Sequence, residues 1–161
     1  MKKILANTRK VRFQDCDPFN HLNNAKYLDY FINAREDQLL DDYGLDVFGL
    51  IATEKLGWVI SSHQIAYFRP AAAMESITIE SQLISYDSRA LVVEMRMYDE
   101  KQTRLKALCW TRFNHFDLAR QKPAEHSAEL SLLFSQALLP VEQQDFEARR
   151  GHLLQQKNEA K

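Results

Sequence analysis

The sequence predicts an α+β fold in which an antiparallel sheet packs against one long helix. Residues 24–43 carry apolar side chains at the spacing of a helix that is covered on most sides. Residues 58–113 then form four successive segments in which apolar and polar side chains alternate, as they do in antiparallel strands. One helix followed by a run of strands is the order of an α+β domain, because parallel strands would need a crossover between them.

The composition is that of a single globular domain. The chain has 161 residues, of which 45% are hydrophobic and 27% charged, so it can bury a core of its own. A net charge of −1 argues against a nucleic-acid partner. No apolar run is long enough to span a bilayer or to act as a secretory signal. Two cysteines, Cys16 and Cys109, make no disulfide framework, and we expect a cytoplasmic protein.

The N-terminal part is expected to form a strand, a polar loop and the start of the helix. A strand over residues 4–13 leads into a loop that contains Asp15 and Asp17. Asn23 or Asn24 is suited to cap the helix that follows, because a side-chain oxygen there can accept from free backbone N–H groups of the first turn.

The long helix is expected to lie at the centre of the fold. Its polar residues fall on one narrow stripe, formed by Lys26, Asp29, Asn33, Glu36 and Asp37. Most of its circumference is therefore expected to be covered. Gly44 follows at the position where a left-handed residue commonly ends a helix.

A connector and the first of the four strands follow the helix. The connector, residues 45–57, is bounded by glycines and is expected to contain one short helical turn. The strand ends at Arg69-Pro70, because proline has no N–H for the sheet. Its alternation predicts one shared face for Trp58, Ile60, Ser62, Gln64, Ala66 and Phe68.

The other three strands complete the predicted sheet. They alternate over residues 77–83, 91–98 and 104–113, with polar hairpin loops at 86–89 and 99–102. Tyr67 and Trp110 are bulky residues on the polar faces, and we expect a partner to cover them. A second, peripheral helix is expected over residues 124–139, ended by Pro140. Residues 1–140 then form one domain, and residues 141–161 a polar, helical tail.

A motif in the first third of the chain resembles a known enzyme family. The pattern F-x-D-x-D-x-x-x-H-x-N-N-A-x-Y-L-x-Y, from Phe13 to Tyr30, is similar to the opening of hotdog-fold acyl-CoA thioesterases of the 4-hydroxybenzoyl-CoA thioesterase type. Residues 65–71 resemble that family's strand before a proline turn, and residues 106–116 its last strand. The likeness spans roughly residues 8–120 and is therefore broader than a single motif.

The resemblance implies a fold, an assembly and a reaction. The fold is a hotdog fold, an antiparallel five-stranded β-sheet wrapped around a central long α-helix. The assembly is a homodimer or homotetramer with active sites at the subunit interface. The reaction is hydrolysis of an acyl-CoA to a carboxylic acid and CoA, without a metal or another cofactor. Two departures concern loop geometry: Asn20 stands where glycine is common, and Met74-Glu75 replaces the usual Gly-Asp.

The same resemblance assigns the catalytic residues. It makes Asp17 the nucleophile or the general base for water. From spacing alone, an aspartate before proline is more often a turn residue. His21 would orient the carbonyl or hold the loop, and Asn23 would position water or act as the helix cap. Backbone N–H groups over residues 23–25, at the helix start near Asn24, would form the oxyanion hole.

The sequence indicates the substrate-binding residues less specifically than the catalytic residues. Tyr27 is a candidate for the acyl pocket, and the CoA phosphates would bind cations among Arg69, Arg89, Lys101 and Arg104, although basic residues at strand ends commonly face solvent. A calcium loop, a zinc site, a phosphate loop and a G-x-S-x-G elbow are all absent from the sequence. Two alternatives remain: an acyl-acyl-carrier-protein (acyl-ACP) thioesterase, and a non-catalytic acyl-CoA-binding module.

Overall fold

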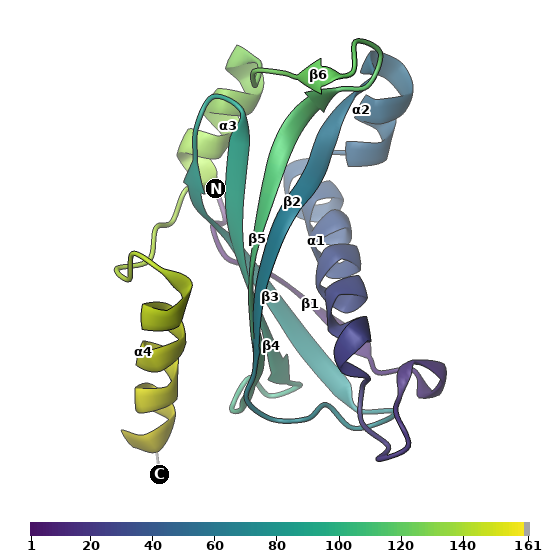
Figure 1. Ribbon diagram of the computed structural model, residues 1–161, viewed down its shortest axis with the longest axis vertical. Coiled ribbons are helices and arrows are strands. Elements are labelled where there is room, and N and C mark those ends of the chain that lie inside the picture. Colours follow the sequence, from purple (N-terminus) through teal and green to yellow (C-terminus); the bar gives the residue numbers. More distant parts are fainter. Residues whose placement is uncertain (160–161) are drawn as a thin grey trace.

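One curled antiparallel sheet carries the long helix α1 (Tyr27–Tyr43) on one face and α4 (Phe146–Glu159) on the other (Figure 1). The computed structural model describes residues 1–159, and the side chains of residues 1–156. The sheet order is β1-β3-β4-β5-β2, with a two-residue β6 beside β5. The strands are β1 (Leu5–Lys10), β2 (Leu56–Tyr67), β3 (Ser76–Tyr86), β4 (Ala90–Asp99), β5 (Leu105–Asp117) and β6 (Lys122–Pro123). The predicted α+β class is confirmed.

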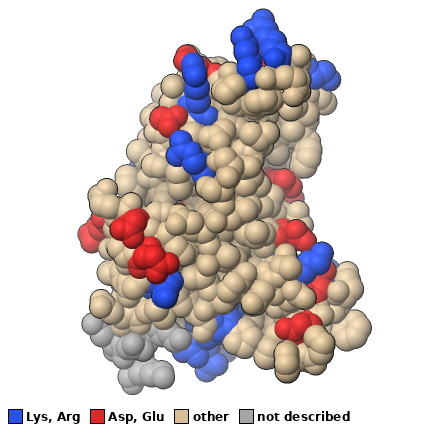
Figure 2. Space-filling model, viewed as in Figure 1, with Lys and Arg blue, Asp and Glu red and all other residues tan. Residues whose placement is uncertain are grey.

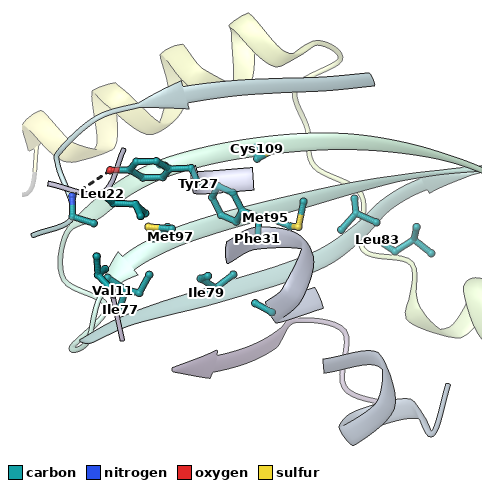
Figure 3. Packing of buried hydrophobic residues seen from close by; sticks show 14 of the residues in the cluster. Val11, Leu22, Tyr27, Phe31, Ile77, Ile79, Leu83, Met95, Met97 and Cys109 are labelled. Atoms are coloured by element: carbon teal, nitrogen blue, oxygen red, sulfur yellow. Dashed lines mark hydrogen bonds between the residues drawn. The ribbon is translucent and has the colours of Figure 1, made fainter. Parts of the chain in front are cut away.

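Helix α1 provides the centre of the core. Its buried apolar face, including Tyr27 and Phe31, packs on Met95 and Met97 of β4 and on neighbouring side chains of β3 (Figure 3). A short 3₁₀ turn (Asn24–Lys26) precedes α1, and Asn23 caps it as predicted. Gly44 ends α1 with φ of 64°, also as predicted, a conformation that glycine adopts without steric penalty.

Strand β2 departs from the predicted alternation. Its pairing with β5 shifts between Ile60 and Ser62, which is a β-bulge at Ser61. The extra residue reverses the faces, so that Trp58 and Ile65 both pack against the core. The prediction that Trp58 to Phe68 share one face at every second residue is therefore wrong. Tyr67 likewise lies on the helix side, where its hydroxyl donates to the backbone oxygen of Asn24 (2.9 Å).

The connector contains a longer helix than predicted. Helix α2 (Val47–Glu54) has two turns where one was expected, and Gly49 lies inside it. Asp46 caps α2 by accepting a hydrogen bond from the backbone N–H of Gly49 (2.8 Å). A Cβ at residue 49 would lie 2.6 Å from Oδ2 of Asp46, so this cap requires glycine.

The C-terminal part forms two helices. Helix α3 (Ala128–Ala137) begins later than predicted, because Ala124 and His126 donate backbone hydrogen bonds to His115 and Ser88 in extended conformation. Helix α4 lies on the outer face of the sheet, and the Phe146 ring packs on Trp110 with centroids 5.8 Å apart. Trp110 is thus covered by the chain itself, where a partner was expected. Residues 160–161 of the predicted tail lie outside the described residues.

No helix within residues 1–159 has the length and hydropathy that a membrane-spanning segment requires.

Candidate active site

The predicted catalytic loop closes on itself beside the start of α1. Cys16 and Leu22 form an antiparallel bridge, and the Asn23 N–H donates to the Asp15 carbonyl oxygen (2.9 Å). The two aspartates and the helix start are thereby held side by side. Asn20 turns the chain with φ of 64°, so asparagine adopts the left-handed conformation that glycine would otherwise supply.

Asp17 is half-buried, and one of its carboxylate oxygens holds the loop. Oδ1 accepts hydrogen bonds from the backbone N–H groups of Phe19 (2.9 Å) and His21 (3.2 Å). Oδ2 accepts none from the residues that the structure describes, so it is available to water or to a substrate. The turn-forming role and the catalytic role therefore use different oxygens of one carboxylate.

The helix start offers one backbone donor where three were expected. Asn23 donates its backbone N–H to Asp15, and its side-chain Oδ1 accepts from the backbone N–H of Ala25 (2.9 Å). Within the described residues, Asn24 is the one residue of the three whose N–H has no partner. Of the three N–H groups predicted to form the oxyanion hole, those of Asn23 and Ala25 are therefore occupied, and an oxyanion role for the Asn24 N–H stays a prediction. The side chain of Asn23 acts as the cap, one of the two roles considered for it.

Asp15 and Tyr30 anchor the loop to α1. The Tyr30 hydroxyl donates to Oδ2 of Asp15 (2.7 Å) and accepts from the backbone N–H of Arg12 (2.8 Å). Burial, together with the neighbouring Asp15, raises the pKa of Tyr30 to about 12. The hydroxyl therefore stays protonated and keeps donating to Asp15 over the whole physiological range.

The proline turn supports the other side of the loop. His21 forms a bridge with Ala72, and its imidazole makes no hydrogen bond to the described residues. Met74 adopts φ of 63°, so the turn keeps a left-handed residue although glycine is absent. The Glu75 carboxylate accepts from the Ala72 N–H (2.8 Å) and pairs with Lys106 (2.8 Å). The departure at Met74-Glu75 therefore preserves an ordered turn.

The predicted binding residues do not all meet at this site. Tyr27 is only 2% exposed, and its hydroxyl accepts from the Ala71 N–H (Figure 3), so it belongs to the core. Arg69 and Arg104 lie at the end of the sheet that carries the loop. Arg89 follows β3 at the opposite end and pairs with Glu125. The length of β3 puts Arg89 roughly 30 Å from the Asp17 loop of its own chain.

A second feature lies further along α1. A cavity of about 210 Å³ opens between α1, α2 and the sheet, lined mainly by apolar side chains that include Ile32, Leu39 and Trp58. Arg35 also lines it and is 8% exposed. Arg35 was not identified from the sequence as a candidate site residue. The available signal was its position outside the polar stripe of the helix.

Titratable groups beside the site do not suggest another chemistry. Burial, Asp15 and Asp17 all raise the pKa of the Cys16 thiol, which disfavours the thiolate and argues against Cys16 as a nucleophile. No group of three or more His, Cys, Asp or Glu side chains suited to a metal occurs among residues 1–156.

Comparison with known proteins places these features in a family. The profile of the thioesterase-like superfamily matches residues 11–134. The long-chain acyl-CoA thioesterase FadM of Escherichia coli (strain K12) is 30% identical over 121 residues, which cover 75% of this chain and 89% of that protein. The crystal structure of YbaW, a probable thioesterase from Escherichia coli, has a TM-score of 0.70 at 27% identity, covering 84% of this chain and 99% of that one.

A more distant structure supports the fold alone. SAV2348 from Staphylococcus aureus, solved in complex with CoA, has a TM-score of 0.77 at 14% identity, covering 90% of this chain and 92% of that one. The predicted hotdog fold is confirmed by the observed sheet and central helix together with these thioesterase structures. With the family profile matching residues 11–134, the resemblance seen in the sequence is also confirmed: this chain belongs to the thioesterase-like superfamily.

Proposed function

We propose that this protein hydrolyses acyl-CoA thioesters to a free carboxylic acid and CoA. One observation carries the proposal: the free carboxylate oxygen of Asp17 and the free N–H of Asn24 belong to one closed loop at the start of α1. A base or nucleophile and an oxyanion donor are the two groups that thioester hydrolysis needs. The activity in the name of the relative FadM, a long-chain acyl-CoA thioesterase, supports the same reaction.

The reaction follows from these two groups. Oδ2 of Asp17 takes a proton from water, and the oxygen of that water bonds to the thioester carbonyl carbon. The carbonyl oxygen becomes an oxyanion, which the Asn24 N–H and the positive end of α1 stabilise. The C–S bond then breaks, and the sulfur takes the proton from Asp17 to give the CoA thiol and the acid. No metal or other cofactor takes part.

The assembly proposed with this reaction is a homodimer formed along β2. This strand pairs with β5 on one side and is an edge of the sheet. Figure 2 shows a largely uncharged surface across the middle of this side of the molecule. On β2, the apolar residues Val59 and Ile60 are each 42% exposed. Antiparallel pairing of two β2 edges would bring Arg89 of one copy toward the Asp17 loop of the other, so both could contact one CoA. Because α4 covers the outer face of the sheet, we favour the dimer over a sheet-to-sheet tetramer.

The remaining parts of the proposal concern location and the form of the substrate. A cytoplasmic location agrees with two cysteines that stay free. A thioester on an acyl carrier protein would use the same catalytic loop, but it would also need a surface that docks the carrier protein. Arg69 and Arg104, at the loop end of the sheet, are the proposed phosphate contacts for CoA.

The decisive experiment measures CoA release from short, medium, long and aromatic acyl-CoAs by wild type and by Asp17→Asn. The amide keeps an Oδ1 acceptor for Phe19 and His21, so the loop should persist while the base is lost. We expect turnover to fall by about 10²- to 10⁴-fold at unchanged melting temperature. Turnover that survives the substitution would reject Asp17. Wild-type binding of acyl-CoA without release would favour the binding module, and release only from acyl-ACP would favour the carrier-protein thioesterase.

A further inference from the structure

Arg35 is a buried cation without a carboxylate partner. Its guanidinium Nη1 donates to the Ser81 hydroxyl (2.9 Å), and Ser81 in turn donates to Gln38. No acidic side chain among residues 1–156 lies within ion-pair distance of Arg35. Burial lowers the pKa of Arg35 to about 10, so it is still charged near pH 7. A buried charge is normally paired, because leaving water without a counter-charge is unfavourable.

The unused donors of Arg35 face the cavity beside α1. Nε and Nη2 make no hydrogen bond to the residues described. Among the described residues, Nε of Arg69 is the only fully enclosed side-chain nitrogen or oxygen that has no hydrogen-bond partner. The two free nitrogens of Arg35 must therefore reach accessible space, and the space that Arg35 lines is this cavity. Nε and Nη2 form one edge of the guanidinium, the fork that binds both oxygens of a carboxylate.

The cavity lies on the same side of α1 as the oxyanion donor. Residues three or four positions apart share a face of a helix. Ala25, Leu28, Ile32 and Leu39 follow this spacing, and the last three are apolar yet only half-buried. This row leads from the helix start to the cavity, so an apolar chain attached to a thioester carbonyl at Asn24 could follow it to Arg35.

We propose that the cavity holds the far end of the acyl group and that Arg35 binds a carboxylate there. The substrate class is then the CoA thioester of a dicarboxylic acid, an ω-carboxyacyl-CoA. This inference rests on the proposed acyl-CoA hydrolysis and adds the nature of the acyl group. Glu36 also lines the cavity. Burial and then the neighbouring Asp37 raise the pKa of the Glu36 carboxyl above its ordinary value.

The length of the chain follows from the helix. Asn24 and Arg35 are 11 residues apart, which is roughly 16 Å along the axis, and an arginine side chain leans back toward the helix N-terminus. At about 1.3 Å per carbon of an extended chain, a span of roughly 10–16 Å corresponds to about 8–12 carbons. The cavity of 210 Å³ is too small for a whole long chain, but it would accommodate the end of one.

The test compares pairs of CoA thioesters of equal length, with and without an ω-carboxylate, at 8, 10 and 12 carbons. Wild type is expected to favour the ω-carboxyacyl-CoA in kcat/KM at one or more of these lengths. Arg35→Met should reduce that preference by about 10- to 100-fold, and Arg35→Lys should reduce it as well, because an ammonium lacks the fork. Arg150→Met, at a half-buried position on α4, is the matched control and should keep the wild-type preference. Melting temperatures of all variants report whether they fold.

Two results would overturn the inference while keeping thioester hydrolysis: no preference in wild type at any length, or an equal preference in wild type and Arg35→Met. If wild type hydrolyses no thioester, the proposed function fails and binding decides the inference separately. Calorimetry would then compare monomethyl sebacate, which carries one free carboxylate, with methyl decanoate, which carries none. Binding of the sebacate alone, lost in Arg35→Met, would support Arg35 as a carboxylate site, and no binding would reject it.

Discussion

Glu94 holds α4 against the outer face of the sheet, and its removal should destabilise the whole protein. The side chain is fully buried (0% exposed) on β4. Its carboxylate accepts from Nη2 and Nε of Arg149 (2.8 and 2.9 Å), from Arg96 (2.5 Å) and from the Trp110 indole (2.8 Å). One acidic group therefore neutralises two arginines and joins three elements of structure.

The loss of stability in Glu94→Ala can be estimated from the ion pairs that the two arginines lose. Arg149 loses its only ion pair among the described residues, while Arg96 keeps its pair with Glu80 (3.0 Å). Removing one partner of a buried ion pair costs about 3–5 kcal/mol. In a chain of this size that corresponds to a fall in melting temperature of roughly 6–20 °C. Arg149→Met should cost less, because Glu94 then keeps Arg96 and Trp110.

Thermal unfolding followed by circular dichroism at pH 7 measures both variants. A fall of less than about 2 °C for Glu94→Ala, or a larger fall for Arg149→Met, would refute this account of the cluster. The loss of stability at acidic pH provides a second measurement. Burial favours the neutral acid, but hydrogen bonds from Arg149 and Trp110 and the charges of Arg96 and Arg149 outweigh it, so the pKa of Glu94 lies below its ordinary value.

A lowered folded-state pKa sets the direction of the pH effect. The contribution of Glu94 is fully present above its unfolded pKa and is lost as the pH falls through the folded pKa. We expect wild type to lose stability below about pH 4.5, with a smaller loss in Glu94→Gln, which has no carboxylate to protonate. Equal acid sensitivity of the two proteins would contradict this role.

Three further predictions follow from single contacts. Tyr27→Phe removes the acceptor for the Ala71 N–H and should lower the free energy of unfolding in urea by about 1–3 kcal/mol. Cys16 should react slowly with iodoacetamide at pH 7 and faster in Asp17→Asn, because burial and the charges of Asp15 and Asp17 raise its thiol pKa; mass spectrometry measures both rates. A chain ending at residue 141 lacks α4 and should show red-shifted tryptophan fluorescence, because Trp110 loses the cover of Phe146.

The parts of the fold that were predicted correctly depend on neighbouring residues in the sequence. The cap at Asn23, the helix end at Gly44 and the strand alternation of β3, β4 and β5 are local patterns. The bulge at Ser61 has no such signal, because a single extra residue in a strand shows only when the partner strand is known. Only one of the two turns of α2 was predicted, because a glycine inside a short segment lowers its helix propensity, although the small size of Gly49 is what the cap at Asp46 requires.

The candidate site also contains features that the local sequence predicts and features that it does not predict. Asp17 and Asn24 are seven residues apart, so one motif contains both and the sequence could indicate them together. The Ala25 N–H is occupied by the predicted cap at Asn23, but the occupation of the Asn23 N–H could not be predicted, because its bond to the Asp15 carbonyl oxygen depends on how the loop closes. The opposite ends of the sheet that separate Arg89 from Arg69 follow from the strand order, which the sequence does not state.

The arginines Arg96, Arg149 and Arg35 differ in whether a carboxylate of the protein pairs with them. Arg96 pairs with Glu94 on its own strand and with Glu80 on β3. Arg149 of α4 pairs with Glu94, so each of these two arginines has a carboxylate partner within the fold. Arg35 contacts only the neutral Ser81 at its guanidinium, and two of its donors are left facing an apolar cavity. Replacing a buried, uncompensated charge by an apolar side chain is often neutral or stabilising. If Arg35→Met raises the melting temperature while Glu94→Ala lowers it, stability alone does not account for Arg35, and a ligand in the cavity does.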